Sequence, residues 1–153
     1  MINLDNMCQK AIEEIDDLKG IYVKEKLIES CKNIIRESMD SDGIRDSIIQ
    51  AALELTTEQE PKWQYVASKL YVYRLYDEVK RNREINVEVE PYSNFYEFIN
   101  EMTDKNLYGK YILENYTQDE IEELEKEIKP ERDFIFTYSG IDLLTKRYLI
   151  QDY

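Results

Sequence analysis

The chain has 153 residues, a length that suits one domain with a single hydrophobic core. Its 33 acidic and 20 basic side chains give a formal net charge of −13, which disfavours association with nucleic acid or anionic membrane surfaces. No apolar run reaches the roughly 20 residues of a membrane span, and the N-terminus lacks the pattern of a signal peptide, so we expect a cytoplasmic protein.

The first predicted helix covers residues 4 to 18, where apolar residues recur every three or four positions. Asn3 or Asp5 can cap its N-terminus. Gly20 is placed to end it, because glycine accepts the left-handed conformation after a last helical turn. The same spacing predicts a second helix over residues 23 to 35.

The third and fourth helices follow after short polar breaks. Ser41 or Asp42 can cap the third helix, whose apolar residues run from Ile44 to Leu55. Pro61 suits the start of the fourth, since proline lacks only an amide hydrogen that would be unpaired there. From residue 62 to 82 the apolar and aromatic residues cover more than one face, so we expect this helix to be the hub of the fold.

Residues 83 to 91 alternate apolar and polar side chains at Ile85, Val87 and Val89 and end in proline. This pattern favours an extended conformation, either a short strand near residues 85 to 90 or an extended linker. The two alternatives are left open by the residues themselves.

The last third of the chain predicts several short helices. Apolar residues at helical spacing indicate one helix over residues 95 to 102 and another around residues 108 to 112. The sequence TQDE from Thr117 to Glu120 has the spacing of a capping box and predicts a third helix. Its apolar residues, expected to point inward, are Ile121, Leu124 and Ile128. Residues 118 to 133 carry eight acidic against three basic side chains, so we place this run on a solvated face.

Together these patterns predict a mainly α protein, a compact multi-helix bundle with at most one short extended segment. We divide it into a helical region over residues 1 to 82, a linker over 83 to 91 and a second helical region over 92 to 153.

The two cysteines, Cys8 and Cys31, each fall within an apolar helical stripe. Two separated cysteines cannot supply the four ligands of a structural zinc site, and they can pair only if the fold brings them together. We therefore expect reduced, buried thiols without a chemical role.

Catalytic and binding motifs are absent from the sequence. It contains no histidine, the commonest general base and metal ligand, and only four scattered glycines, too few for a phosphate-binding loop. Asp40, Asp42 and Gly43 match part of a calcium loop, but Ile49 stands where the bidentate glutamate is needed. The 13 tyrosines are interpreted as core and interface residues. We predict no catalytic, nucleotide-binding or metal-binding residues and no cofactor in this chain.

Several segments resemble the N-terminal region of the large (alpha) subunit of class I ribonucleoside-diphosphate reductases. FTYSGIDLLTKRYLIQD, from Phe136 to Asp152, resembles the phrase that leads into the catalytic barrel of that family. INLDNM, DSIIQAALEL and EPKWQYVASKLYVYRLYDEV resemble the helices of the family's ATP-cone and the long helix after it. The resemblance implies that residues 1 to 82 are ATP-cone-like and that residues 92 to 153 lead into a barrel outside this chain.

The sequence departs from the ATP-cone pattern in three places. The basic hairpin that holds the phosphates in that family is missing, Asn6 replaces a lysine, and Arg45 stands at the position of a later histidine. The resemblance therefore does not extend to nucleotide binding.

The resemblance implies a parent enzyme that reduces ribonucleotides to deoxyribonucleotides for DNA synthesis, with a separate small, radical-generating subunit as partner. Cys8 and Cys31 do not occupy the family's catalytic positions, so this chain alone is expected to be inactive. It would be a fragment or one piece of a split subunit that docks on the remainder of the large subunit. Apolar surface around the set Phe134, Phe136, Leu144, Tyr148 and Leu149 would then mediate docking or form a homodimer.

The alternative is a stand-alone acidic helical protein-interaction module, which should be monodisperse and expose few apolar patches. A third hypothesis is a nucleotide sensor that keeps the function of the ATP-cone.

Overall fold

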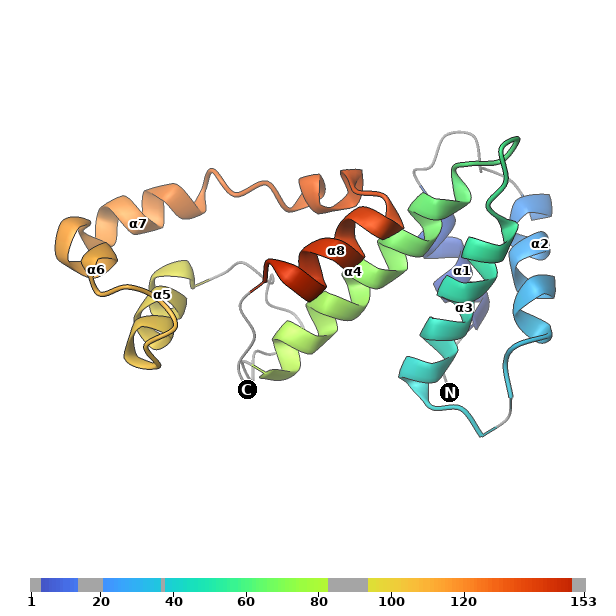
Figure 1. The fold of residues 1–153 in the computed structure, drawn as a ribbon, viewed down its shortest axis with the longest axis horizontal. Coiled ribbons are helices and arrows are strands. Elements are labelled where there is room, and N and C mark those ends of the chain that lie inside the picture. Colours follow the sequence, from blue (N-terminus) through green and yellow to red (C-terminus); the bar gives the residue numbers. More distant parts are fainter. Residues whose placement is uncertain (1–3, 14–20, 37, 83–93, 150–153) are drawn as a thin grey trace.

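The computed structural model describes residues 4–13, 21–36, 38–82 and 94–149. Within these ranges it contains helices and no strand, which confirms the predicted mainly α fold. Residues 85 to 90, where the sequence predicts an extended segment, lie outside the described part of the chain. Figure 1 shows an elongated arrangement with α1 to α3 towards one end and α5 to α7 towards the other.

The first four helices build the core of the described structure. Helix α4 (Trp63–Asn82) contacts α1, α3, α8 and the 3-10 helix η2, so the predicted hub is confirmed. Trp63, Val66 and Leu70 on α4 are buried in one core cluster with residues of the three preceding helices. Removing their apolar surface from water stabilises this packing. Those three helices are α1 (Leu4–Ile12), α2 (Ile21–Lys32) and α3 (Ser41–Leu55).

The N-cap of α3 lies one residue before Ser41 and two before Asp42, the two residues predicted as the cap. The cap is Asp40, whose side chain accepts a hydrogen bond of 2.8 Å from the Gly43 backbone N–H. Asp40 also has the extended backbone that an N-cap residue needs, whereas Ser41 is already helical. The spacing of apolar residues does not show which of several neighbouring polar residues caps a helix. For this reason the sequence alone predicted the cap too late in the chain.

Helices α3 and α4 are joined by three ion pairs along their shared seam. The distances are 2.6 Å between Arg45 Nη2 and Asp77 Oδ2, 2.7 Å between Arg74 Nη1 and Asp46 Oδ1, and 3.2 Å between Arg81 Nη1 and Asp42 Oδ2. As the residue number rises on α3 it falls on α4, so the pairs follow an antiparallel register. We call these six residues the ion-pair ladder.

The C-terminal part of the described chain folds back onto α4. Helix η2 (Pro130–Ile135) is fixed there by Tyr76, whose hydroxyl donates to Asp133 Oδ2 at 2.6 Å. Helix α8 (Tyr138–Arg147) buries Ile141, and the Tyr138 ring meets Tyr71 edge to face with 5.7 Å between ring centroids. Figure 1 shows α8 lying alongside α4.

The remaining helices form a separate cluster in which α5 packs against α7. The predicted capping box is present, and Ile121 is buried as expected. Leu124, however, is 55% exposed, so its inward orientation was wrong, and Ile128 is half-buried beyond the end of the helix. The main contact of α7 is with α5, and one neighbour covers only one side of a short helix, so a second apolar position can remain in solvent. The bounds are α5 (Phe95–Asp104), α6 (Tyr111–Asn115) and α7 (Gln118–Glu125).

Candidate docking surface

The outer side of α8 and its two flanking turns expose large apolar side chains. On the side of the same helix that faces α4, Ile141 is buried and Tyr138 is half-buried. We call the exposed set the α8 strip; it consists of Ile135, Phe136, Leu143, Tyr148 and Leu149.

Backbone geometry places members of the α8 strip along the length of α8, from its first turn to its last. The Phe136 ring lies against Gly140, where an added Cβ would stand 3.7 Å from Phe136 Cδ1. Leu143 follows Gly140 by one turn of helix and therefore shares its face. At the C-terminus the backbone N–H groups of Tyr148 and Leu149 both donate to the Leu144 carbonyl, at 2.9 and 3.0 Å. This turn places Tyr148 and Leu149 next to the last turn of α8.

The sequence predicted apolar surface in this region, but it selected the residues only in part. Phe136, Tyr148 and Leu149 are exposed as expected. Phe134 is not, because its ring packs against the rings of Tyr73 and Tyr76, with centroids 5.4 and 6.2 Å away.

Leu144 is half-buried, whereas Ile135 and Leu143 are exposed and were missed. The helical spacing of Tyr138 and Ile141, three residues apart, is a sequence signal that identifies the inner face of α8 and so places Leu143 outside it.

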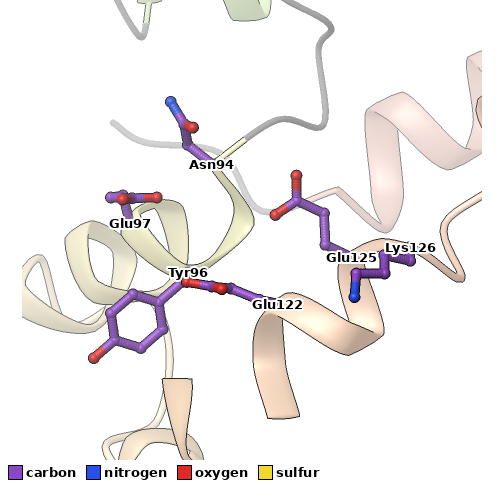
Figure 2. Close-up of a pocket in the computed structure, with 6 residues that line it drawn as sticks. All are labelled: Asn94, Tyr96, Glu97, Glu122, Glu125 and Lys126. Carbon is purple, nitrogen blue, oxygen red and sulfur yellow. The ribbon is translucent and has the colours of Figure 1, made fainter. Parts of the chain in front are cut away.

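A cleft of about 460 Å³ lies between the start of α5 and the end of α7. It is lined by Asn94, Tyr96 and Glu97 on one side and by Glu122, Glu125 and Lys126 on the other (Figure 2). Glu125 is already used in the structure, because its Oε2 accepts a hydrogen bond of 3.0 Å from the Phe95 backbone N–H. The cleft holds three carboxylates against one ammonium, and we assign it no catalytic role.

Arg45 is the residue that stands at the position of a histidine in the resembling family. Its guanidinium is bound to Asp77 within the ion-pair ladder and its side chain is only 13% exposed. An arginine that is already paired with a carboxylate has little positive charge left to attract a triphosphate. Among the described residues, no group of three or more His, Cys, Asp or Glu side chains is arranged to hold a metal ion.

The helices of the described ranges include none with the length and apolarity needed to cross a membrane. Longest among them is α4, which carries charged residues in its last turn.

Comparison with known proteins gives relatives of one kind. The chain is 34% identical over 127 residues to the ribonucleoside-diphosphate reductase subunit alpha of Enterobacteria phage T4, an alignment that covers 83% of this chain and 16% of that subunit. It is 32% identical over 117 residues to the subunit alpha of Treponema pallidum, covering 76% of this chain and 13% of that one. For the ribonucleoside-diphosphate reductase 1 subunit alpha of Salmonella typhimurium the identity is 26% over 151 residues, an alignment that covers 99% of this chain and 19% of that subunit. No protein-family model matches the chain.

The chain thus spans less than a fifth of the length of the curated relatives it matches. These alignments confirm the relationship that the C-terminal phrase and the N-terminal helices predicted. Over most of its length the chain is homologous to the N-terminal region of ribonucleoside-diphosphate reductase alpha subunits.

Proposed function

We propose that this chain forms the N-terminal helical region of a ribonucleoside-diphosphate reductase large subunit and supports a catalytic barrel located elsewhere in that subunit. The observation that carries the proposal is the extent of the similarity, which covers 83% of this chain but only 16% of the phage T4 subunit. The parent enzyme would reduce ribonucleotides to deoxyribonucleotides, and this chain would contribute packing and no chemistry of its own.

The α8 strip is the proposed contact with the remainder of the subunit. Four of its five side chains lie within the segment Phe136 to Asp152, which resembles the family's approach to the barrel, and Ile135 directly precedes it. Contiguous exposed apolar side chains favour association, because burying them releases water from apolar surface. We propose the remainder of the large subunit as the partner that covers the α8 strip, because more than four fifths of each aligned subunit has no counterpart in this chain.

The experiment mixes the purified chain with a polypeptide that carries the remaining part of the large subunit, obtained from the coding sequence downstream of Tyr153 or from a neighbouring gene. Size-exclusion chromatography with light scattering should give a one-to-one complex. Reduction of ribonucleoside diphosphates, measured with the small subunit present, should require both polypeptides.

Variants identify the contact. The double substitution Phe136→Ser and Leu149→Ser should weaken the complex at least about tenfold, because two apolar anchors are lost. Leu124→Ser is the matched control: Leu124 is as exposed as Leu149 but lies on α7, away from α8 in Figure 1. It should leave the affinity unchanged.

Two outcomes would overturn the proposal. Reduction of a ribonucleotide by the chain alone would contradict the assignment of the chemistry to other residues. If the chain is monodisperse and forms no complex with the remaining part of the subunit, this result would favour the alternative function, a stand-alone acidic interaction module. The local excess of acidic side chains over residues 118 to 133 is the feature that favours that alternative.

Nucleotide binding separates the proposal from a retained ATP-cone sensor. Because Arg45 is paired with Asp77, we expect no saturable heat of binding when this chain is titrated with ATP or dATP up to millimolar concentration. A dissociation constant in the micromolar range in isothermal titration calorimetry would reassign the chain as a sensor.

A further inference from the structure

The fold places the chain's two cysteines on two helices that pack against each other, a neighbourhood that their positions in the sequence do not predict. Cys8 lies on α1 and Cys31 near the end of α2, and these two helices pack against each other. Both thiols are free and fully buried in the same core cluster. The two helices are also joined at their surface by an ion pair of 3.0 Å between Lys24 Nζ and Asp5 Oδ1.

The two thiols influence each other's ionisation. Side-chain hydrogen bonding with Cys31, together with burial, raises the pKa of the Cys8 thiol above its usual value. The same hydrogen bond lowers the pKa of Cys31, because the Cys8 S–H stabilises the Cys31 thiolate by donating to it. Cys31 is therefore the first of the pair to become a nucleophile, with Cys8 beside it.

We propose that Cys8 and Cys31 form a reversible intramolecular disulfide that fastens α1 to α2 when a small-molecule disulfide is available as oxidant. The inference is independent of the proposed function, because it concerns residues outside the α8 strip. It assigns a modification site to a pair that would otherwise only fill the core.

The exchange balances with a glutathione-type disulfide, RSSR. The Cys31 thiolate attacks one sulfur of RSSR, forms a mixed disulfide and releases RS⁻, which takes up a proton. The Cys8 thiol then loses its proton to solvent and attacks the Cys31 sulfur, which releases the second RS⁻. The protein loses two electrons and two protons, and RSSR becomes two RSH.

Access to the buried pair requires a local opening of the structure. Helix α1 is short, with only nine residues, and a short element can open locally at lower free energy than the whole fold. The oxidant reaches Cys31 in the open form, and reclosure of α1 returns Cys8 to the mixed disulfide. Oxidation should therefore be slow but should favour the internal bridge over a lasting adduct.

The test equilibrates the full chain in buffers of graded ratio of reduced to oxidised glutathione, followed by acid quenching, alkylation and intact mass measurement. The expected product is a monomer that has lost two hydrogen atoms and carries no glutathione. Its equilibrium constant of formation should be at least about 100-fold larger than in the same chain unfolded in guanidinium chloride, since a bridge that fits the fold and the fold itself stabilise each other.

The equilibrium is approached from both sides so that slow access does not decide the result. Chain oxidised in denaturant and then refolded should reach the same ratio as chain that starts reduced. The bridged protein should melt roughly 5 °C or more above the reduced protein. Cys8→Ala should give only a single glutathione adduct at Cys31 or none.

The proposal fails if the native equilibrium constant is equal to or below that of the unfolded chain. It also fails if the oxidised product is a glutathione adduct or an intermolecular dimer, or if the bridge lowers the melting temperature. Each of these results would mean that the native geometry holds the thiols close without allowing the bond.

Discussion

At the scale of single residues, the capping box of α7 is the best determined feature. The Thr117 backbone N–H donates to Glu120 Oε2 at 2.8 Å, the Thr117 hydroxyl donates to the same oxygen at 2.9 Å, and the Glu120 N–H donates back to that hydroxyl at 3.3 Å. The backbone hydrogen bond from Thr117 and then the hydroxyl bond lower the pKa of Glu120 below the usual value of 4.5. The backbone N–H group of each residue thus donates a hydrogen bond to the side chain of the other.

The capping box predicts that the N-terminus of α7 loses stability at acidic pH. Because the folded pKa is lowered, the stabilisation is complete above pH 4.5 and is lost as the pH falls through the lowered folded value. An NMR titration of the Glu120 carboxyl should give a midpoint below 4.5, and Thr117→Ala should return it towards 4.5 while costing about 1 kcal/mol of helix stability. A midpoint at or above 4.5 in the unmodified chain would show that the box does not form.

The residue scale also shows where sequence patterns reach their limit. The capping box was predictable because all its partners lie within four positions. Leu124 was not, because its exposure depends on how far the neighbouring α5 extends over α7. A residue on an apolar stripe is buried only if another element covers it.

At the scale of secondary-structure elements, the ion-pair ladder fixes the register of α3 on α4. Its pairs differ in solvent exposure: the Arg45 side chain is 13% exposed, whereas that of Arg81 is 58% exposed. Exposed pairs contribute little because water screens the charges, and partly buried pairs contribute more when the geometry is good. The ladder should therefore be strongest where it is most covered.

Double-mutant cycles with alanine test this ranking. We expect a coupling free energy of about 1 kcal/mol for Arg45 with Asp77 and less than about 0.5 kcal/mol for Arg81 with Asp42, from urea unfolding of the single and double variants. The second pair is the control, since it joins the same two helices. Equal coupling energies would mean that burial does not set the strength of the ladder.

The helices themselves were largely predictable at this scale, whereas their ends and partners were not. The spacing of apolar residues predicted α3, α4 and α5 because each has a covered face. The choice of Asp40 as the α3 cap and the fit of η2 onto α4 depended on contacts between side chains that the period does not encode.

At the scale of the whole molecule, the charge of −13 opposes the compact state by self-repulsion. Salt screens this repulsion, with a Debye length of about 10 Å at 0.1 M. It also weakens the ion pairs, but each of those described has at least one side chain that is 45% or more exposed, so each contributes little. The relief of the net repulsion should therefore outweigh the loss of the pairs.

We expect the melting temperature to rise by a few degrees, on the order of 3 °C, between 10 and 300 mM NaCl. Differential scanning calorimetry measures it. The double substitution Glu114→Gln and Glu127→Gln, at two exposed positions, should flatten this dependence. A melting temperature that falls with added salt would mean that specific ion pairs, rather than net charge, dominate the electrostatics.

The sequence by itself determined the helical class, the hub helix, the absence of histidine and the likeness to reductase alpha subunits, because periodicity, composition and short motifs are local properties of a chain. Only the tertiary structure decided that Phe134 turns inwards while Phe136 faces solvent, and that Cys8 meets Cys31. Those outcomes depend on which helix faces meet, and helices that are far apart in sequence meet through the burial of their combined surfaces, which no single segment specifies.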